Sequence, residues 1–126
     1  MKHKKDILIL GYSGTASQCP FDTETWGINL AGKYCLGRKV DYCFAFDELP
    51  SEYITEMKKL APIISFQDYA DFQYPLQEIL DTFRSKYFVN SLCYMIAYAI
   101  YVGTKRLSLY GCDTMLGGMW QRESKG

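Results

Sequence analysis

The feature that most constrains the fold is a short strand that is apolar on both of its faces. Residues Asp6–Leu10 read DILIL, and the run ends at Gly11. A continuous short apolar run is typical of a strand buried on both sides in a parallel sheet, whereas a half-exposed strand alternates apolar and polar residues. The sequence therefore predicts a parallel sheet that helices cover on both faces.

Four further segments are predicted strands, and three predicted helices lie among them. The strand segments are rich in apolar, β-branched and aromatic residues and are bounded by turn formers. They are Trp26–Leu30, Lys39–Phe46, Ala61–Phe66 and Arg106–Tyr110. Ser51 can cap a first helix that continues EYITEMKKL. Pro75 suits the first position of a second helix, whose apolar residues recur at helical spacing from Leu76 to Phe83.

The third predicted helix, in NSLCYMIAYAIYVG, is apolar almost all round. It can be capped at Asn90 or Ser91 and closed by Gly103. Such a helix must be buried on several sides, and about 12 residues are too few to cross a bilayer. Because strands alternate with helices, we expect an α/β fold, a single Rossmann-like domain over residues 1–126 with a mostly parallel sheet flanked by helices.

The two ends of the chain fall outside this pattern. Residues 1–5 contain a basic cluster that we interpret as a solubilising tail. Residues 114–126 have no clear period, so they are open to three interpretations: a lid, an oligomer contact or a mobile tail.

Charge and hydropathy exclude several kinds of partner. Lys and Arg number 14, as do Asp and Glu, so no net field attracts nucleic acid or an acidic membrane. The sequence has no continuous apolar run of about 18 residues, and no apolar signal region follows the N-terminal lysines. We therefore expect a cytoplasmic protein whose partners include neither nucleic acid nor a membrane.

The five cysteines are widely spaced and contain no CxxC pair. This pattern favours reduced, mostly buried thiols over a disulfide framework or a zinc site. We expect no bound metal. The 11 tyrosines suit ligand pockets and interfaces, and equally an aromatic core whose hydroxyls reach the surface.

The first candidate ligand site is the loop after the first strand. In an open parallel sheet, ligands bind beyond the carboxyl ends of the strands, where successive loops converge. Two glycines allow a close backbone approach, N–H groups and hydroxyls can hold phosphate oxygens, and a tyrosine can stack on a base. The residues are Gly11, Tyr12, Ser13, Gly14 and Thr15. A plain turn is the alternative.

Two other loops supply polar groups to the same edge of the predicted sheet. Asn29 can read a base edge or a ribose hydroxyl, or it can cap a helix that begins near Ala31. Asn90 and Ser91 begin the buried helix, where backbone N–H groups and the helix dipole favour an anion. Ordinary helix capping is the alternative for this pair.

The last strand is followed by Gly111, Cys112 and Asp113. The Asp113 carboxylate could orient a ribose or act as a base, and a turn-forming Asp is the alternative. We interpret Cys112 as a packing residue because the sequence indicates no partner base for it.

The order of these segments resembles that of the family-42 bacterial sialyltransferases. The segments are the GYSGT loop, WGINLAGKYCLGRKVDYCFAF and YFVNSLCYMIAYAIYVGTKRLSLYGCD, and together they span Ile7 to Asp113. The related 6-hydroxymethylpterin-pyrophosphokinase-like and motility-accessory-factor domains share these landmarks, as do short bacteriophage proteins.

This resemblance implies a Rossmann-like fold that binds a nucleotide across the strand ends, which in the transferases is a CMP-linked sugar. By position, it implies that the first loop approaches phosphate and ribose and that Asn29 contacts the nucleotide. The remaining positions would close over the nucleotide or line its far side: Asn90, Ser91, Gly111 and Asp113.

The chain also departs from the family. The transferases carry a catalytic histidine downstream of the last landmark and an Asn-Gly-Pro-Ser type loop, whereas the only histidine here is His3 and the loop reads GYSGT. We therefore predict a non-catalytic protein that binds a nucleotide-type small molecule without a cofactor. A phage-encoded sponge for a nucleotide-derived signal, working as a homo-oligomer, would fit this prediction.

Two alternatives remain at the level of sequence. The first is a glycosyl- or pyrophosphoryl-transfer enzyme in which Asp113 is the catalytic residue. The second is a domain retained only as an interaction scaffold, with its crevice filled by its own side chains.

Overall fold

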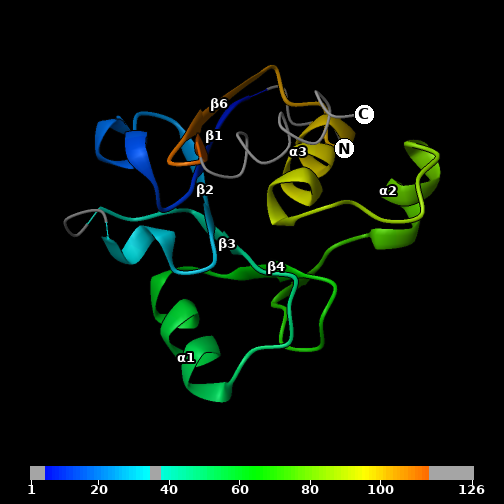
Figure 1. The fold of residues 1–126 in the computed structure, drawn as a ribbon, viewed down its shortest axis with the longest axis horizontal. Coiled ribbons are helices and arrows are strands. Elements are labelled where there is room, and N and C mark those ends of the chain that lie inside the picture. Colours follow the sequence, from blue (N-terminus) through cyan, green and yellow to red (C-terminus); the bar gives the residue numbers. More distant parts are fainter. Residues whose placement is uncertain (1–4, 35–37, 114–126) are drawn as a thin grey trace.

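A computed structural model describes residues 5–34 and 38–113 of the chain. Within these residues, six strands form one fully parallel sheet, and helices lie against it (Figure 1). The strands are β1 (Asp6–Leu10), β2 (Glu24–Ile28), β3 (Tyr42–Phe44), β4 (Ile63–Ser65), β5 (Phe72–Gln73) and β6 (Arg106–Tyr110). The predicted α/β class is confirmed.

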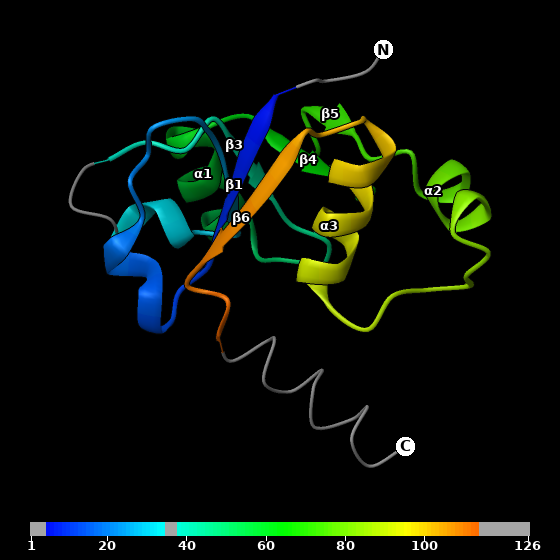
Figure 2. The same ribbon diagram turned by 90° about the horizontal axis from the view of Figure 1, so that it is seen from above.

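The strand order contains one reversal. From edge to edge the order is β5-β4-β3-β2-β1-β6. The chain therefore adds β2 to β5 on one side of β1 and then returns to place β6 on the other side. Figure 2 shows β1 and β6 side by side, and every residue of β1 has a partner in β6. This arrangement makes the carboxyl ends of β1 and β6 the topological switch point of the sheet.

Helices cover both faces of the sheet. On one face lies α1 (Ser51–Leu60), which connects β3 to β4, and on the other lie α2 (Leu76–Thr82) and α3 (Ser91–Tyr101), which connect β5 to β6 (Figures 1 and 2). Short 3-10 helices, η1 (Gly14–Gln18) and η2 (Ala31–Tyr34), follow β1 and β2. None of the described helices is long and apolar enough to span a bilayer.

The β1 strand shows why its sequence is apolar throughout. Ile7 and Ile9 belong to the core under α3, and Leu8 and Leu10 belong to the core on the α1 side. All four side chains are at most 1% exposed. Full burial of such a side chain contributes about 1.5–3 kcal/mol relative to exposure, so the strand is strongly held in the centre of the sheet.

The core under α3 is a layer of aromatic rings. The Trp26 and Phe44 rings of the sheet have centroids 4.9 Å apart, and the centroid of each lies 5.6 Å from that of Tyr98 in α3. Tyr74 is 2% exposed, and its hydroxyl donates a hydrogen bond to the Tyr94 carbonyl oxygen at 2.7 Å. These tyrosines therefore fit the aromatic-core interpretation.

Several element boundaries differ from the sequence prediction. The second strand runs two residues earlier than predicted and ends at Ile28, because Asn29 adopts a left-handed backbone with φ of 53°. Only Tyr42–Phe44 of the predicted third strand pairs with its neighbours. The β5 strand is not among the predicted strands, because its two residues are exposed and too few to show a period. Pro50, and not Ser51, is the N-cap of α1.

The described cysteines are all free thiols: Cys19, Cys43, Cys93 and Cys112. Three of them are buried, as the prediction of reduced, mostly buried thiols requires. Cys35, residues 1–4 of the predicted basic tail and the segment 114–126 lie outside the described residues.

Candidate functional site

The loops that leave β1 and β6 are joined by hydrogen bonds at the switch point. The Ser13 N–H and hydroxyl both donate to the Gly111 carbonyl oxygen, at 3.0 and 2.9 Å. The Gly111 N–H donates to the Thr15 hydroxyl oxygen at 2.9 Å. The predicted candidates after β1 and after β6 are therefore brought together.

Two glycines allow these loops to touch through their backbones. A Cβ on Gly11 would lie 2.3 Å from the Gly111 carbonyl oxygen, and a Cβ on Gly111 would lie 2.6 Å from the Gly11 carbonyl oxygen. Gly111 also has φ of 73°, which side chains rarely adopt. Close packing between the loops thus accounts for both glycines.

The Asp113 carboxylate sits on the first loop. One of its oxygens accepts from the Thr15 N–H at 3.0 Å, and the other accepts from the Thr15 hydroxyl at 3.3 Å. Gly14 makes room for it, because a Cβ there would lie 1.8 Å from the carboxylate. The N–H groups of Ser13, Thr15 and Ala16 therefore donate to the protein's own acceptors, although the sequence prediction assigned such groups to a phosphate.

Tyr12 connects the first loop to the neighbouring elements. Its hydroxyl accepts from the Leu30 N–H at 3.0 Å and shares a hydrogen bond with the Tyr53 hydroxyl of α1 at 3.3 Å. Asn29 is also hydrogen-bonded to this hydroxyl. Burial of the hydroxyl, together with Tyr53, raises the pKa of Tyr12 well above its usual range. The residue as a whole is 49% exposed, so part of its surface still faces solvent.

Asn90 and Ser91 lie at the start of α3. Asn90 is the N-cap, and its side-chain oxygen accepts from the Cys93 N–H at 3.0 Å. Tyr94, in the first turn, packs on Phe46 just beyond β3. Helix capping accounts for the Asn90 side chain.

The thiol beside the switch point is buried and has a raised pKa. Cys112 is 1% exposed, and its Sγ lies 3.5 Å from the Tyr110 carbonyl oxygen. Burial, followed by the charge of Asp113, raises the pKa of the Cys112 thiol to about 11. The thiolate that a nucleophile requires is therefore scarce, in agreement with a packing role.

Two pockets that the sequence did not predict lie around the start of β2, at the opposite, amino edge of the sheet. Glu24, the first residue of β2, lines both. The smaller pocket, of about 170 Å³, is lined by Glu24, Trp26, Tyr42, Ile64, Phe72 and Tyr98. The larger, of about 420 Å³, is mainly polar and is lined by Lys5, Phe21, Asp22, Thr23, Glu24, Thr25, Lys39 and Asp41.

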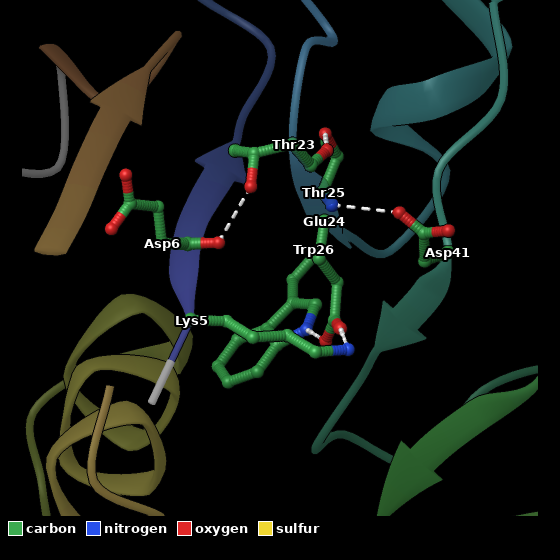
Figure 3. A network of polar contacts seen from close by, with 7 residues as sticks. All are labelled: Lys5, Asp6, Thr23, Glu24, Thr25, Trp26 and Asp41. Carbon is green, nitrogen blue, oxygen red and sulfur yellow. Dashed lines mark hydrogen bonds and ion pairs between the residues drawn. The ribbon is translucent and has the colours of Figure 1, made fainter. Parts of the chain in front are cut away.

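Glu24 is held between a cation and an indole, as Figure 3 shows. One carboxylate oxygen accepts from Trp26 Nε1 at 2.7 Å, and the other lies 3.3 Å from Lys5 Nζ. Glu24 and Trp26 are two residues apart on one strand and so share a face of the sheet. That spacing of an acidic and an aromatic residue is the sequence signal for a polar group among aromatic rings, whereas the pairing of Trp26 with Tyr42 is known only from the structure.

The strand starts around Glu24 are fixed by further hydrogen bonds (Figure 3). The Thr23 hydroxyl donates to the Asp6 carbonyl oxygen at 2.7 Å, and the Thr25 N–H donates to Asp41 at 2.8 Å. These contacts hold the first residues of β1 and β2 and the segment before β3 in one arrangement.

Within residues 5–34 and 38–113, no three His, Cys, Asp or Glu side chains are grouped so that they could hold a metal ion. Comparisons with protein-family models, curated proteins and solved structures found no match. The fold and site define a class, namely α/β domains with a parallel sheet in which hydrogen bonds join the two loops at the switch point.

Proposed function

We propose that this protein binds a small nucleotide-type molecule at the carboxyl ends of β1 and β6 and releases it unchanged. The observation that carries the proposal is the Asp113 carboxylate, which Thr15 anchors at the switch point of the sheet. Switch points are the usual ligand sites of open parallel sheets.

The chemistry of Asp113 favours a ribose over a phosphate. A carboxylate has about four acceptor positions, and Thr15 uses two of them, so two remain for a vicinal diol. A phosphate would instead need the loop N–H groups, which already donate within the protein. Tyr12, hydrogen-bonded through its hydroxyl and half exposed, is the side chain we assign to stacking on the base.

Binding without turnover is the role that these side chains favour. Burial raises the pKa of the Cys112 thiol to about 11, so little nucleophilic thiolate is present at neutral pH, and residues 5–34 and 38–113 contain no histidine that could serve as a general base. Sequestration of a nucleotide-derived signal, as by a viral sponge, is the biological role we propose for such a site.

The first experiment is mass spectrometry of small molecules released by denaturing the purified protein. It is followed by calorimetry with nucleotides, ADP-ribose-type metabolites and cyclic dinucleotides. We expect Asp113→Asn to weaken binding by roughly tenfold or more, because hydrogen bonds to a charged group are stronger than those to a neutral one. The control is Asp81→Asn, which removes a carboxylate from α2.

Two outcomes would contradict the proposal. If the wild type and Asp113→Asn bind the nucleotide-type ligand with equal affinity, Asp113 does not contact that ligand. Recovery of a chemically altered ligand would show turnover and would favour the transferase alternative.

A further inference from the structure

The smaller pocket at the amino edge is far too small for a nucleotide. Its volume is about 170 Å³. A cavity of roughly 150 Å³ holds benzene, whereas pockets for larger ligands measure about 300–1,000 Å³. The pocket therefore suits a compact group of a few heavy atoms, and it lies at the other end of the strands from Asp113.

Aromatic side chains form most of the wall of this pocket. Trp26 and Tyr98 lie with ring centroids 5.6 Å apart, and Tyr42 meets Phe72 edge to face at 6.1 Å. Phe72 is 54% exposed, so it forms a rim that solvent reaches. Aromatic faces carry partial negative charge and attract cations, most strongly when water is excluded.

Glu24 supplies a negative charge at the polar end of the pocket. Its side chain is only 14% exposed, and the Trp26 indole N–H holds one carboxylate oxygen in place. A carboxylate set in this way among aromatic rings is suited to an ammonium group.

The protein's own Lys5 already places an ammonium group on Glu24. The Lys5 side chain is 64% exposed, and its Nζ lies 3.3 Å from Glu24. Ion pairs with so exposed a partner contribute little to stability, so a ligand cation can replace Lys5 at small cost.

The groups that surround Glu24 leave a net negative charge once Lys5 is displaced. Asp22 and Asp41 line the adjoining pocket together with Lys39. On the α3 side, burial raises the pKa of Tyr98, and the neighbouring Tyr42 and Glu24 raise it further. The Tyr98 phenol therefore stays neutral and leaves the carboxylate as the charged group of the pocket.

We propose that this pocket binds a small organic cation, with its ammonium or methylated ammonium group against Glu24 and the aromatic wall. Lys5 is the competing internal cation.

The test uses choline and its uncharged carbon isostere, 3,3-dimethylbutan-1-ol. Trp120→Phe leaves Trp26 as the only tryptophan, so its fluorescence reports on the pocket. We expect choline to bind, and we expect the affinity of the isostere to be lower by roughly tenfold or more. Glu24→Gln should lower the choline affinity by roughly tenfold or more, whereas Lys5→Met should raise it several-fold, on the order expected for loss of a competing surface cation.

The opposite signs of these two substitutions separate a ligand site from a structural ion pair. The control is Lys59→Met, which makes the same charge change in the exposed Lys59–Glu56 pair of α1 and should leave choline affinity unchanged. Equal binding of the isostere, no binding of choline, or weaker binding in Lys5→Met would overturn the proposal. If circular dichroism shows that Glu24→Gln is unfolded, the choline affinity of Lys5→Met and the affinity of the isostere still test the proposed cation site.

Discussion

The contact between the backbones of Gly11 and Gly111 leads to a quantitative prediction about stability. In Gly111→Ala, the new Cβ would lie 2.6 Å from the Gly11 carbonyl oxygen, 2.7 Å from the Gly11 carbonyl carbon and 2.9 Å from the Ala16 Cβ. None of these atoms is the end of a flexible side chain. The two loops must therefore separate, which disturbs their hydrogen bonds across the switch point.

Two contributions add in this variant. A left-handed conformation costs a residue with a Cβ about 1–2 kcal/mol, and overpacking costs about 1–3 kcal/mol. We expect Gly111→Ala to lower the free energy of unfolding by about 2–5 kcal/mol and the Tm by roughly 8–20 °C. Gly11→Ala should lose about 1–3 kcal/mol, because only the overpacking contribution applies.

Urea and thermal unfolding followed by circular dichroism would measure these losses. The control is Gly103→Ala, since Gly103 has φ of 81° at the end of α3 and measures the conformational contribution. A loss in Gly111→Ala no larger than in Gly103→Ala would refute the close approach of the loops. A double variant of Gly11 and Gly111 should also destabilise by less than the two losses added, because the same separation of the loops relieves both contacts.

Three further predictions concern other parts of the fold. Asp71 accepts from the Ile63 N–H and, in a second contact, from Lys58, and these bonds lower its pKa below the ordinary 3.8. Its contribution to stability is therefore present above pH 3.8 and is lost as the pH falls through the lower folded-state pKa, so Asp71→Asn should flatten the acid side of a Tm–pH profile. Burial raises the pKa of Cys43 to about 12, so the reactive thiolate at pH 8 is on the order of a thousandfold scarcer in the native protein than in urea, and alkylation measured by mass spectrometry should be slower to a similar extent. Tyr74→Phe should cost about 0.5–1.5 kcal/mol in urea unfolding, since it removes a buried hydrogen bond.

Local hydrophobic patterns were enough to predict the class of fold. The unbroken apolar run at Ile7–Leu10 indicated a parallel strand with both faces covered, and the apolar segment after Asn90 indicated a buried helix. Both inferences depend only on which side chains avoid water. The β5 strand escaped prediction because its two exposed residues carry no such pattern.

The candidate site was predictable in position and not in its internal bonding. Loops that follow parallel strands emerge at one edge of the sheet, so the meeting of the first loop with Asp113 was a reasonable expectation. The Thr15–Asp113 hydrogen bonds join residues 98 positions apart, and they depend on distances of tenths of an ångström. No local pattern carries that information.

The sequence alone determined which segments are buried and that the sheet is parallel. The reason is that the spacing of apolar residues along each segment shows which of its faces avoid water. Only the tertiary structure decided that β6 lies beside β1, which creates the switch point, and that Glu24 and Trp26 meet Tyr42 and Tyr98 in a pocket at the other edge. Both outcomes depend on which distant segments pack together. That choice rests on the free energy of the whole fold and not on the propensity of any one segment.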